Sequence, residues 1–231
     1  MELNKYIDHT NLKMNATSKD IEKLCKEALE YGFASVCINP FYVEYAKELL
    51  KDSNVCVCTV IGFPLGMNTI SVKEYEAIDA INNGADEIDM VINVGALKDK
   101  NYEYIKKEIE TIRDSIGGKT LKVIIETNLL EPKEIAKMTE ICNDTYVNFV
   151  KTCTGFNGSV KLSDVEIISE NKNEILEIKA SGGIDDIDKI EELIKLDVTR
   201  IGTSHALKIM NVHHNCDCHC SDGCSCHNEE E

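Results

Sequence analysis

The sequence lacks three features, and each absence excludes a class of protein. No run of about 18 apolar residues occurs, which excludes a membrane-spanning helix. No charged start followed by an apolar stretch opens the chain, so we expect a cytoplasmic protein and no membrane partner. The fingerprint G-x-G-x-x-G does not follow the first expected strand, which argues against dinucleotide binding.

Positive charge is also scarce, because 25 Lys and Arg residues stand against 41 Asp and Glu residues and give a formal net charge of -16. The electrostatic attraction that dominates binding to nucleic acids and anionic membranes would here be a repulsion. We therefore expect no nucleic acid partner. An anionic small molecule would need a local positive pocket.

Cysteine is unevenly placed. Five of the 11 cysteines follow residue 215, and the others are scattered through apolar segments, where they are small core residues. This distribution favours a reducing compartment over a disulfide framework. With 231 residues, 43% of them hydrophobic, the chain can bury one main core.

Apolar runs rich in β-formers recur along the chain and have the form of parallel strands covered on both faces. They are residues 35–39, 55–63, 87–92, 121–127, 148–154, 175–181 and 199–204, with a weaker run at 6–10. Between them lie segments with helical spacing of apolar residues. These are Ile105, Ile109, Ile112 and Ile116 in one segment, and Ile187, Ile190, Leu193 and Ile194 in another.

An early helix is predicted from Thr17, with Asp20 completing a capping box, to Gly32. Its expected buried face is Ile21, Leu24, Cys25, Ala28 and Leu29. The strand and helix series fits a closed barrel or an open doubly wound sheet, and the pattern favours the barrel. We expect an α/β fold, a (β/α)8 TIM barrel over residues 1–212, followed by a Cys/His-rich tail, residues 213–231, that is disordered without metal.

Two lysines stand inside expected strands. Lys151 lies four residues before Gly155 and Lys179 three before Gly182, so they should reach similar heights on strands about 4.8 Å apart. Two close, buried ammonium groups repel, so at least one pKa should fall, and a neutral amine is a nucleophile. The alternative is that each stem is buried while its charged end reaches solvent.

Asp89 and two glycine-rich segments are further candidates. Strand alternation places Asp89 on one face with Val91, where it could exchange protons or form a structural ion pair. The segments "SGGI" (181–184) and "IGTSHAL" (201–207) follow the last two strands, where barrels of this kind bind phosphate. The same glycines could be ordinary turn residues.

Seven motifs together resemble the 2-deoxyribose-5-phosphate aldolase family over residues 3 to 210. They are "IDHTNLK", "EIDMVINVGALK", "KVIIETNLL", "FVKTCTGF", "VKLSDVEII", "IKASGGI" and "RIGTS". The resemblance implies a lyase of deoxynucleoside catabolism, a class I aldolase without a catalytic metal or cofactor. Its partners would be a phosphorylated sugar, aldehydes and a second copy in a homodimer. It would reversibly cleave 2-deoxy-D-ribose 5-phosphate to acetaldehyde and D-glyceraldehyde 3-phosphate.

The resemblance also implies residue roles. Lys151 would form the Schiff base, Lys179 would favour its neutral form, and Asp89 would be the acid-base group. The substrate- and phosphate-binding residues would be Thr154, Gly182, Gly183, Gly202, Thr203 and Ser204. The chain departs from the family at Cys153, where Ser is usual, and in having no Tyr after Tyr146.

The tail holds nine soft ligands whose spacing does not match a two-pair zinc finger. They are Cys216, Cys218, Cys220, Cys224, Cys226, His213, His214, His219 and His227. Such a density of thiols and imidazoles suits Zn²⁺, Cu⁺ or Ni²⁺. Two alternative functions therefore stay open: a metal-storing or metal-sensing protein, and another Schiff-base barrel lyase.

Deleting residues 213–231 separates these possibilities. We expect the deletion to remove the soft metal ions that the tail binds and to leave the aldolase rate unchanged, because a Schiff-base route needs no Lewis acid. Metal analysis of the purified protein and a retro-aldol assay with chelator present measure the two effects. If the aldolase rate fell when the tail and its metal were removed, the tail would have a part in catalysis and this expectation would be wrong.

Overall fold

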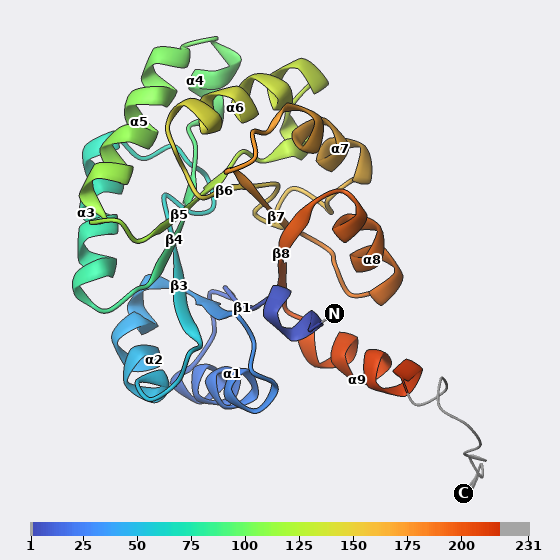
Figure 1. The fold of residues 1–231 in the computed structure, drawn as a ribbon. Helices are drawn as coiled ribbons and strands as arrows, with labels where there is room; N and C mark the ends of the chain where they lie inside the picture. Colours follow the sequence, from blue (N-terminus) through green and yellow to red (C-terminus); the bar gives the residue numbers. More distant parts are fainter. Residues whose placement is uncertain (1, 218–231) are drawn as a thin grey trace, which may run out of the picture.

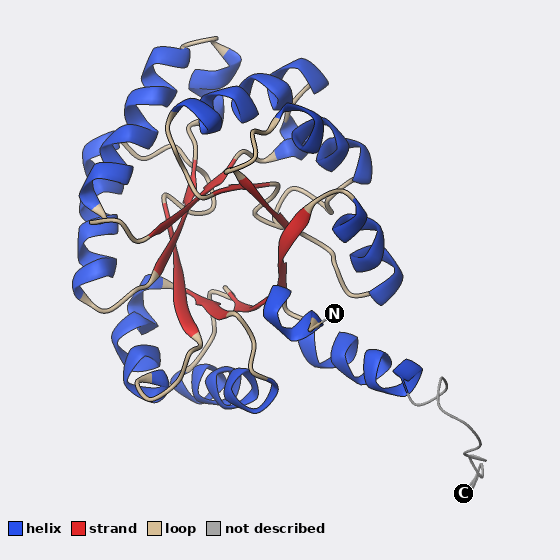
Figure 2. Cartoon of the chain, in the orientation of Figure 1, coloured by secondary structure: helices blue, strands red, loops and turns tan. Residues whose placement is uncertain are grey.

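The computed structural model describes residues 2–217, which form a closed barrel of parallel strands inside a ring of helices (Figure 1, Figure 2). The strands pair in sequence order, and β8 pairs with β1 to close the ring. They are β1 Ile7–Asn11, β2 Ser35–Ile38, β3 Cys56–Ile61, β4 Glu87–Val91, β5 Thr120–Ile124, β6 Phe149–Lys151, β7 Glu177–Ser181 and β8 Val198–Thr203. The barrel prediction is confirmed, and the open sheet is excluded.

Helices cover the outside of this barrel (Figure 2). They are α1 Ser18–Tyr31, α2 Val43–Leu50, α3 Ile70–Asn82, α4 Val94–Lys98, α5 Tyr102–Ser115, α6 Pro132–Asp144, α7 Leu162–Asn171, α8 Ile187–Lys195 and α9 Ala206–Asp217, with 3-10 turns η1 Leu3–Tyr6, η2 Pro40–Tyr42 and η3 Thr127–Leu129. Within residues 2–217, no helix is long and apolar enough to cross a membrane. The tail ligands from Cys218 onward lie outside the described residues, as do the side chains of His213, His214 and Cys216.

The predicted helix signals are largely confirmed. Thr17 and Asp20 form the capping box of α1, and Gly32 ends the helix in a left-handed conformation at φ 64°. Leu29 was expected to be buried, and this was wrong, because its side chain is 44% exposed. At about 100° per residue, Leu29 falls at the edge of the stripe that the other four apolar residues of α1 bury.

The other two apolar helix faces also pack on the barrel. All four isoleucines of the first set, Ile105, Ile109, Ile112 and Ile116, are at most 1% exposed. In α8, Ile190 and Leu193 are buried, whereas Ile187 and Ile194 are partly buried against the same core. The helices therefore fix the outer faces of the strands and leave the inner faces to the barrel interior.

One ion pair is buried away from the barrel axis. Lys73 on α3 donates to Glu108 on α5 at 2.7 Å, and both side chains are 0% exposed. The same ammonium donates to the carbonyls of Gly66 and Val91, so it links the loop after β3 to the end of β4. All three of its protons are thus used, as a buried ammonium requires.

Removing one member of this pair should strongly destabilise the fold. We expect Lys73→Met to lower the free energy of unfolding by about 3–5 kcal/mol, because Glu108 would be left buried without its partner. The double variant Lys73→Met/Glu108→Leu should recover most of that loss. Urea denaturation measures both, and Lys137→Met, which removes an exposed pair with Glu140, is the control. Equal losses in the single and double variants would contradict the argument.

Candidate active site

The three predicted chemical residues meet inside the barrel, at the carboxyl ends of the strands. Lys151 ends β6 and is the register partner of Lys179 on β7, as their matched heights predicted. Both ammonium groups approach the same oxygen, Oδ2 of Asp89 on β4, at 2.8 Å from Lys151 and 2.7 Å from Lys179. Lys151 is 3% exposed and the other two are 0% exposed, so neither lysine carries its charge out to solvent.

Further charged residues, which sequence reasoning missed, complete the cluster. Asp8 on β1 approaches Lys179 Nζ at 2.5 Å through Oδ2 and accepts from Arg200 on β8 at 2.7 Å through Oδ1. The signal that identified Lys151, a charge inside an apolar strand, was present here too. It was not applied to Asp8 in "YIDHT" or to Arg200 in "TRIGTS".

Lys122 on β5 is the third buried lysine of the interior. Its ammonium lies 2.5 Å from Oε2 of Glu87 and 3.0 Å from Oδ1 of Asp89, and it is 0% exposed. Asp89 therefore divides its oxygens: Oδ1 faces Lys122, and Oδ2 faces Lys151 and Lys179. This division keeps the carboxylate in one orientation.

The cluster fixes the charge of its members. Burial alone would raise the pKa of Asp89, but the charges of Lys122, Lys151 and Lys179 hold it well below its usual value. Burial alone would lower the pKa of Lys179, but Asp8 and Asp89 raise it above its usual value. Asp89 is therefore a carboxylate at neutral pH. Lys179 is a permanent cation, and its pKa does not fall as two close ammonium groups had predicted.

Lys151 differs from the other basic residues of the cluster in its access to a ligand. The interior also contains Lys122, Lys179 and Arg200, which pair with Asp8, Glu87 and Asp89. Of these four basic side chains, Lys151 alone lines a cavity.

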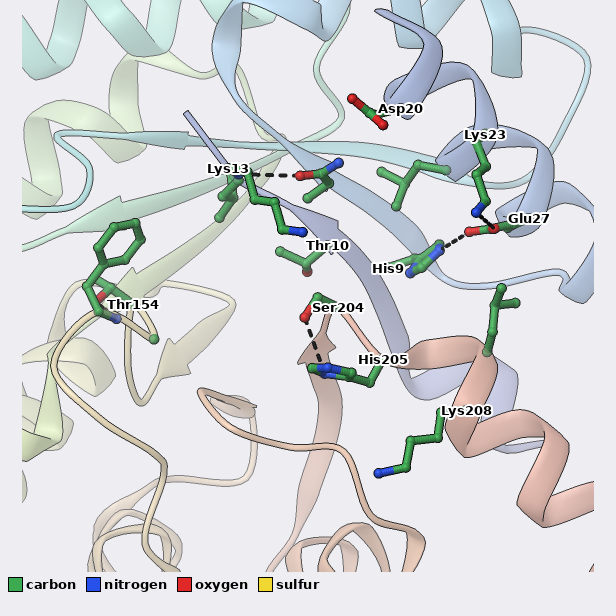
Figure 3. Close-up of a pocket in the computed structure, with 16 residues that line it drawn as sticks. His9, Thr10, Lys13, Asp20, Lys23, Glu27, Thr154, Ser204, His205 and Lys208 are labelled. Atoms are coloured by element: carbon green, nitrogen blue, oxygen red, sulfur yellow. Dashed lines mark hydrogen bonds and ion pairs between the residues drawn. The ribbon is translucent and has the colours of Figure 1, made fainter. Parts of the chain in front are cut away.

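Two adjoining cavities open above this cluster at the mouth of the barrel. The smaller one, of about 190 Å³, contains Lys151. All six predicted substrate- and phosphate-binding residues line it with Lys151: Thr154, Gly182, Gly183, Gly202, Thr203 and Ser204. The larger one, of about 700 Å³, shares Thr10, Thr154 and Ser204 with it, and Figure 3 shows Lys13, Lys23 and Lys208 around its wall.

The glycines of the smaller cavity are required by their surroundings. Gly182 and Gly183 have φ of 104° and 62°, and a Cβ on Gly183 would lie 2.0 Å from Oγ of Ser159. A Cβ on Gly202 would lie 3.2 Å from Cε of Lys179, so this glycine makes room for the lysine stem. The loop after β7 can therefore bring backbone N–H groups close to a ligand.

Two of the predicted binding hydroxyls are already used inside the protein. Thr203 donates to the carbonyl of Ile184 at 2.6 Å and accepts from the N–H of His205 at 2.9 Å. The hydroxyl of Thr154 donates to the carboxylate of Glu126. Ser204, which is exposed, directly precedes the turn into α9 and keeps a hydroxyl at the cavity.

Cys153, where the family usually has Ser, is fully buried and lies apart from both cavities. Its sulfur contacts the Thr127 hydroxyl and the Asn128 amide, each at 3.4 Å. Burial raises the pKa of this thiol, so it is a neutral packing group.

Fold and cluster together define a (β/α)8 barrel with a lysine-centred active site at the carboxyl ends of its strands. The family model "DeoC/LacD family aldolase" matches residues 3–209, and the chain belongs to this family. The chain is 56% identical over 196 residues to the deoxyribose-phosphate aldolase of Metamycoplasma hominis, covering 84% of this chain and 90% of that protein. It is 53% identical over 210 residues to that of Clostridium perfringens, covering 90% and 94%.

Solved structures agree with this family. The structure entitled "QR15, an Aldolase" has a TM-score of 0.89 at 36% identity and covers 94% of this chain and 98% of its own. Deoxyribose phosphate aldolase from Aeropyrum pernix, described as tetrameric, has a TM-score of 0.86 at 29% identity and covers 93% and 92%.

Removing the permanent charge of Lys179 tests the charge argument. We expect Lys179→Met to slow turnover and to move the rise of the rate with pH upward by roughly one pH unit, because the loss of this cation raises the pKa of Asp89, which must be a carboxylate to accept protons. A pH–rate profile measures both, with Lys137→Met as a surface control. A slower enzyme whose pH profile is unchanged would show that Lys179 does not act through charge.

Proposed function

We propose that the chain is a class I aldolase that reversibly cleaves 2-deoxy-D-ribose 5-phosphate to acetaldehyde and D-glyceraldehyde 3-phosphate, with Lys151 as its Schiff-base residue. The family and the named relatives support this activity over a metal-storing role or another barrel lyase. The observation that supports the choice of Lys151 is its place in the smaller cavity, directly above the carboxylate it shares with Lys179.

The first step is addition of the Lys151 amine to the C1 aldehyde. Asp89 Oδ2, 2.8 Å from this nitrogen, can accept a proton from the ammonium form, and water leaves as the carbinolamine becomes an iminium. Lys179 stays charged beside it and disfavours reprotonation of the free amine. The protein itself provides the electron sink, so we propose that the reaction uses neither a cofactor nor a catalytic metal.

Cleavage follows from the position of the iminium. Loss of the C3 hydroxyl proton turns C3 into an aldehyde carbon, and the electrons of the C2–C3 bond flow into the iminium to give an enamine. Asp89 is 0% exposed beneath the cavity, so we propose that it exchanges these protons through a water molecule. Protonation of C2 and hydrolysis then release acetaldehyde and restore the Lys151 amine.

The phosphate of the substrate is proposed to bind the two loops after β7 and β8. Gly182 and Gly183 expose backbone there, Ser204 offers a hydroxyl, and α9 begins at Ala206 with its positive end toward the same cavity. Thr203 is proposed to hold the loop after β7 through the carbonyl of Ile184, and Thr154 to hold the loop after β6 through Glu126, while each contacts the substrate through its backbone. Gly202 admits the Lys179 stem and contributes backbone to the same wall.

Location and assembly remain proposals as well. The six cysteines from Cys25 to Cys153 are free thiols, which supports a reducing, cytoplasmic setting. A homodimer is proposed from the family resemblance, and the relative from Aeropyrum pernix is described as a tetramer. We also propose that residues 1–212 form the catalytic domain and that the Cys/His-rich tail, residues 213–231, binds soft metals independently of it.

Trapping of the covalent intermediate tests the proposal. Borohydride reduction with acetaldehyde present should attach a two-carbon adduct to Lys151, because this amine faces the cavity. Peptide mass spectrometry locates the adduct, and Lys151→Arg should lose both the adduct and retro-aldol turnover of 2-deoxyribose 5-phosphate. An adduct on another lysine in the wild-type protein would overturn the assignment.

A further inference from the structure

Two thiols lie under the active site without a role in the proposed mechanism. Cys37 on β2 and Cys58 on β3 are register partners, and both are free and 0% exposed. Cys58 Sγ lies 3.1 Å from Oδ1 of Asp89, the oxygen that does not face Lys151. One ligand atom from each of the three residues lies within 4.8 Å of the other two.

We infer that Cys37, Cys58 and Asp89 Oδ1 form an inhibitory site for a thiophilic divalent cation such as Zn²⁺ or Cd²⁺. Tetrahedral zinc binds thiolates at about 2.3 Å and carboxylate oxygens at about 2.1 Å, so its ligand atoms stand roughly 3.5 Å apart. The two sulfurs and the carboxylate oxygen lie within 4.8 Å of one another, so small side-chain adjustments bring them to this geometry. A water molecule can be the fourth ligand.

Leu12 connects the thiols to the barrel mouth. It lines both cavities and packs with Phe63 against the small cluster of Cys37, Cys58 and Val60. The proposed route of an ion from the smaller cavity to the thiols therefore passes Leu12.

Charge decides which ion can bind. The two thiols lose their protons to solvent when they bind the metal, so the two positive charges gained and the two protons released cancel. A hard cation such as Mg²⁺ does not displace thiol protons and would add two charges beside Lys122, Lys151 and Lys179. The interior therefore selects for thiophilic ions. Burial and Asp89 raise the pKa of Cys58 well above its usual value, so a bound metal has to displace the proton of this thiol, which the ammonium of Lys122 at 3.2 Å from Sγ assists.

The expected effect on catalysis rests on the proposed function. It follows because Oδ1 of Asp89 would bind the metal, whereas Oδ2 faces Lys151 and Lys179. A metal on Oδ1 withdraws negative charge from the carboxylate and displaces its contact with Lys122. Asp89 then accepts protons less well from Lys151 and substrate, while the phosphate loops stay open. Inhibition should therefore lower kcat with little change in KM.

The test measures retro-aldol turnover of the full chain against buffered free Zn²⁺. Cys37→Ser and Cys58→Ser should each raise the concentration for half-inhibition at least about tenfold, relative to each variant's own metal-free rate, because thiophilic ions bind hydroxyls weakly. Cys142→Ser, which changes a buried cysteine of α6, should match wild type, and Mg²⁺ should not inhibit.

The tail is present in every variant, so its own metal binding affects all of them equally. Inhibition of Cys37→Ser and Cys58→Ser at the wild-type concentration would overturn the inference.

A second measurement does not depend on activity. In the full chain with the five tail cysteines replaced by Ser, titration with Co²⁺ should give one bound ion with a thiolate charge-transfer band, and adding Cys58→Ser should remove the band. If no such band forms, the metal site is wrong and the aldolase proposal is untouched. If the band forms and no retro-aldol turnover is found without metal, the aldolase proposal fails and the metal site stands.

Discussion

One carboxylate oxygen shared by two ammonium groups is the interaction on which the active site depends. Oδ2 of Asp89 accepts from both Lys151 and Lys179, in a region where water cannot screen the charges. If both lysines were charged, this oxygen would face two cations that repel each other. Asp8 also holds Lys179 charged, whereas Lys151 is the one of the two lysines that lines the smaller cavity.

The closed barrel makes this arrangement possible. Parallel strands in fixed register bring the ends of β4, β6 and β7 to one height, and the outer helices bury the other faces of those strands. A charged side chain that points into the barrel is then surrounded by the other side chains that point into the barrel. The interior consequently contains a nearly balanced set of ions where an ordinary core would contain aliphatic side chains.

Much of this could be predicted from sequence, for identifiable reasons. Lys151 and Lys179 stood out because a lysine inside an apolar strand has no local explanation, and the glycine after each strand gave their heights. Asp8 and Arg200 are also charged residues inside expected strands, and they were missed. They pair with each other across 192 positions, and no local pattern in the sequence indicates that pairing. The internal use of the Thr203 hydroxyl could not be predicted, since it depends on the exact path of the loop after β7.

Closure of the ring by β1 and β8 has a consequence for synthesis. Asp8 and Arg200, which bond across that seam, are separated by 192 positions in the chain. A ribosome-bound chain that has not yet released β8 lacks the guanidinium that balances Asp8, and the first strand has no final neighbour. The charged cluster around the lysines is therefore complete only after β8 has been synthesised, and a chain that stops before β8 cannot form it.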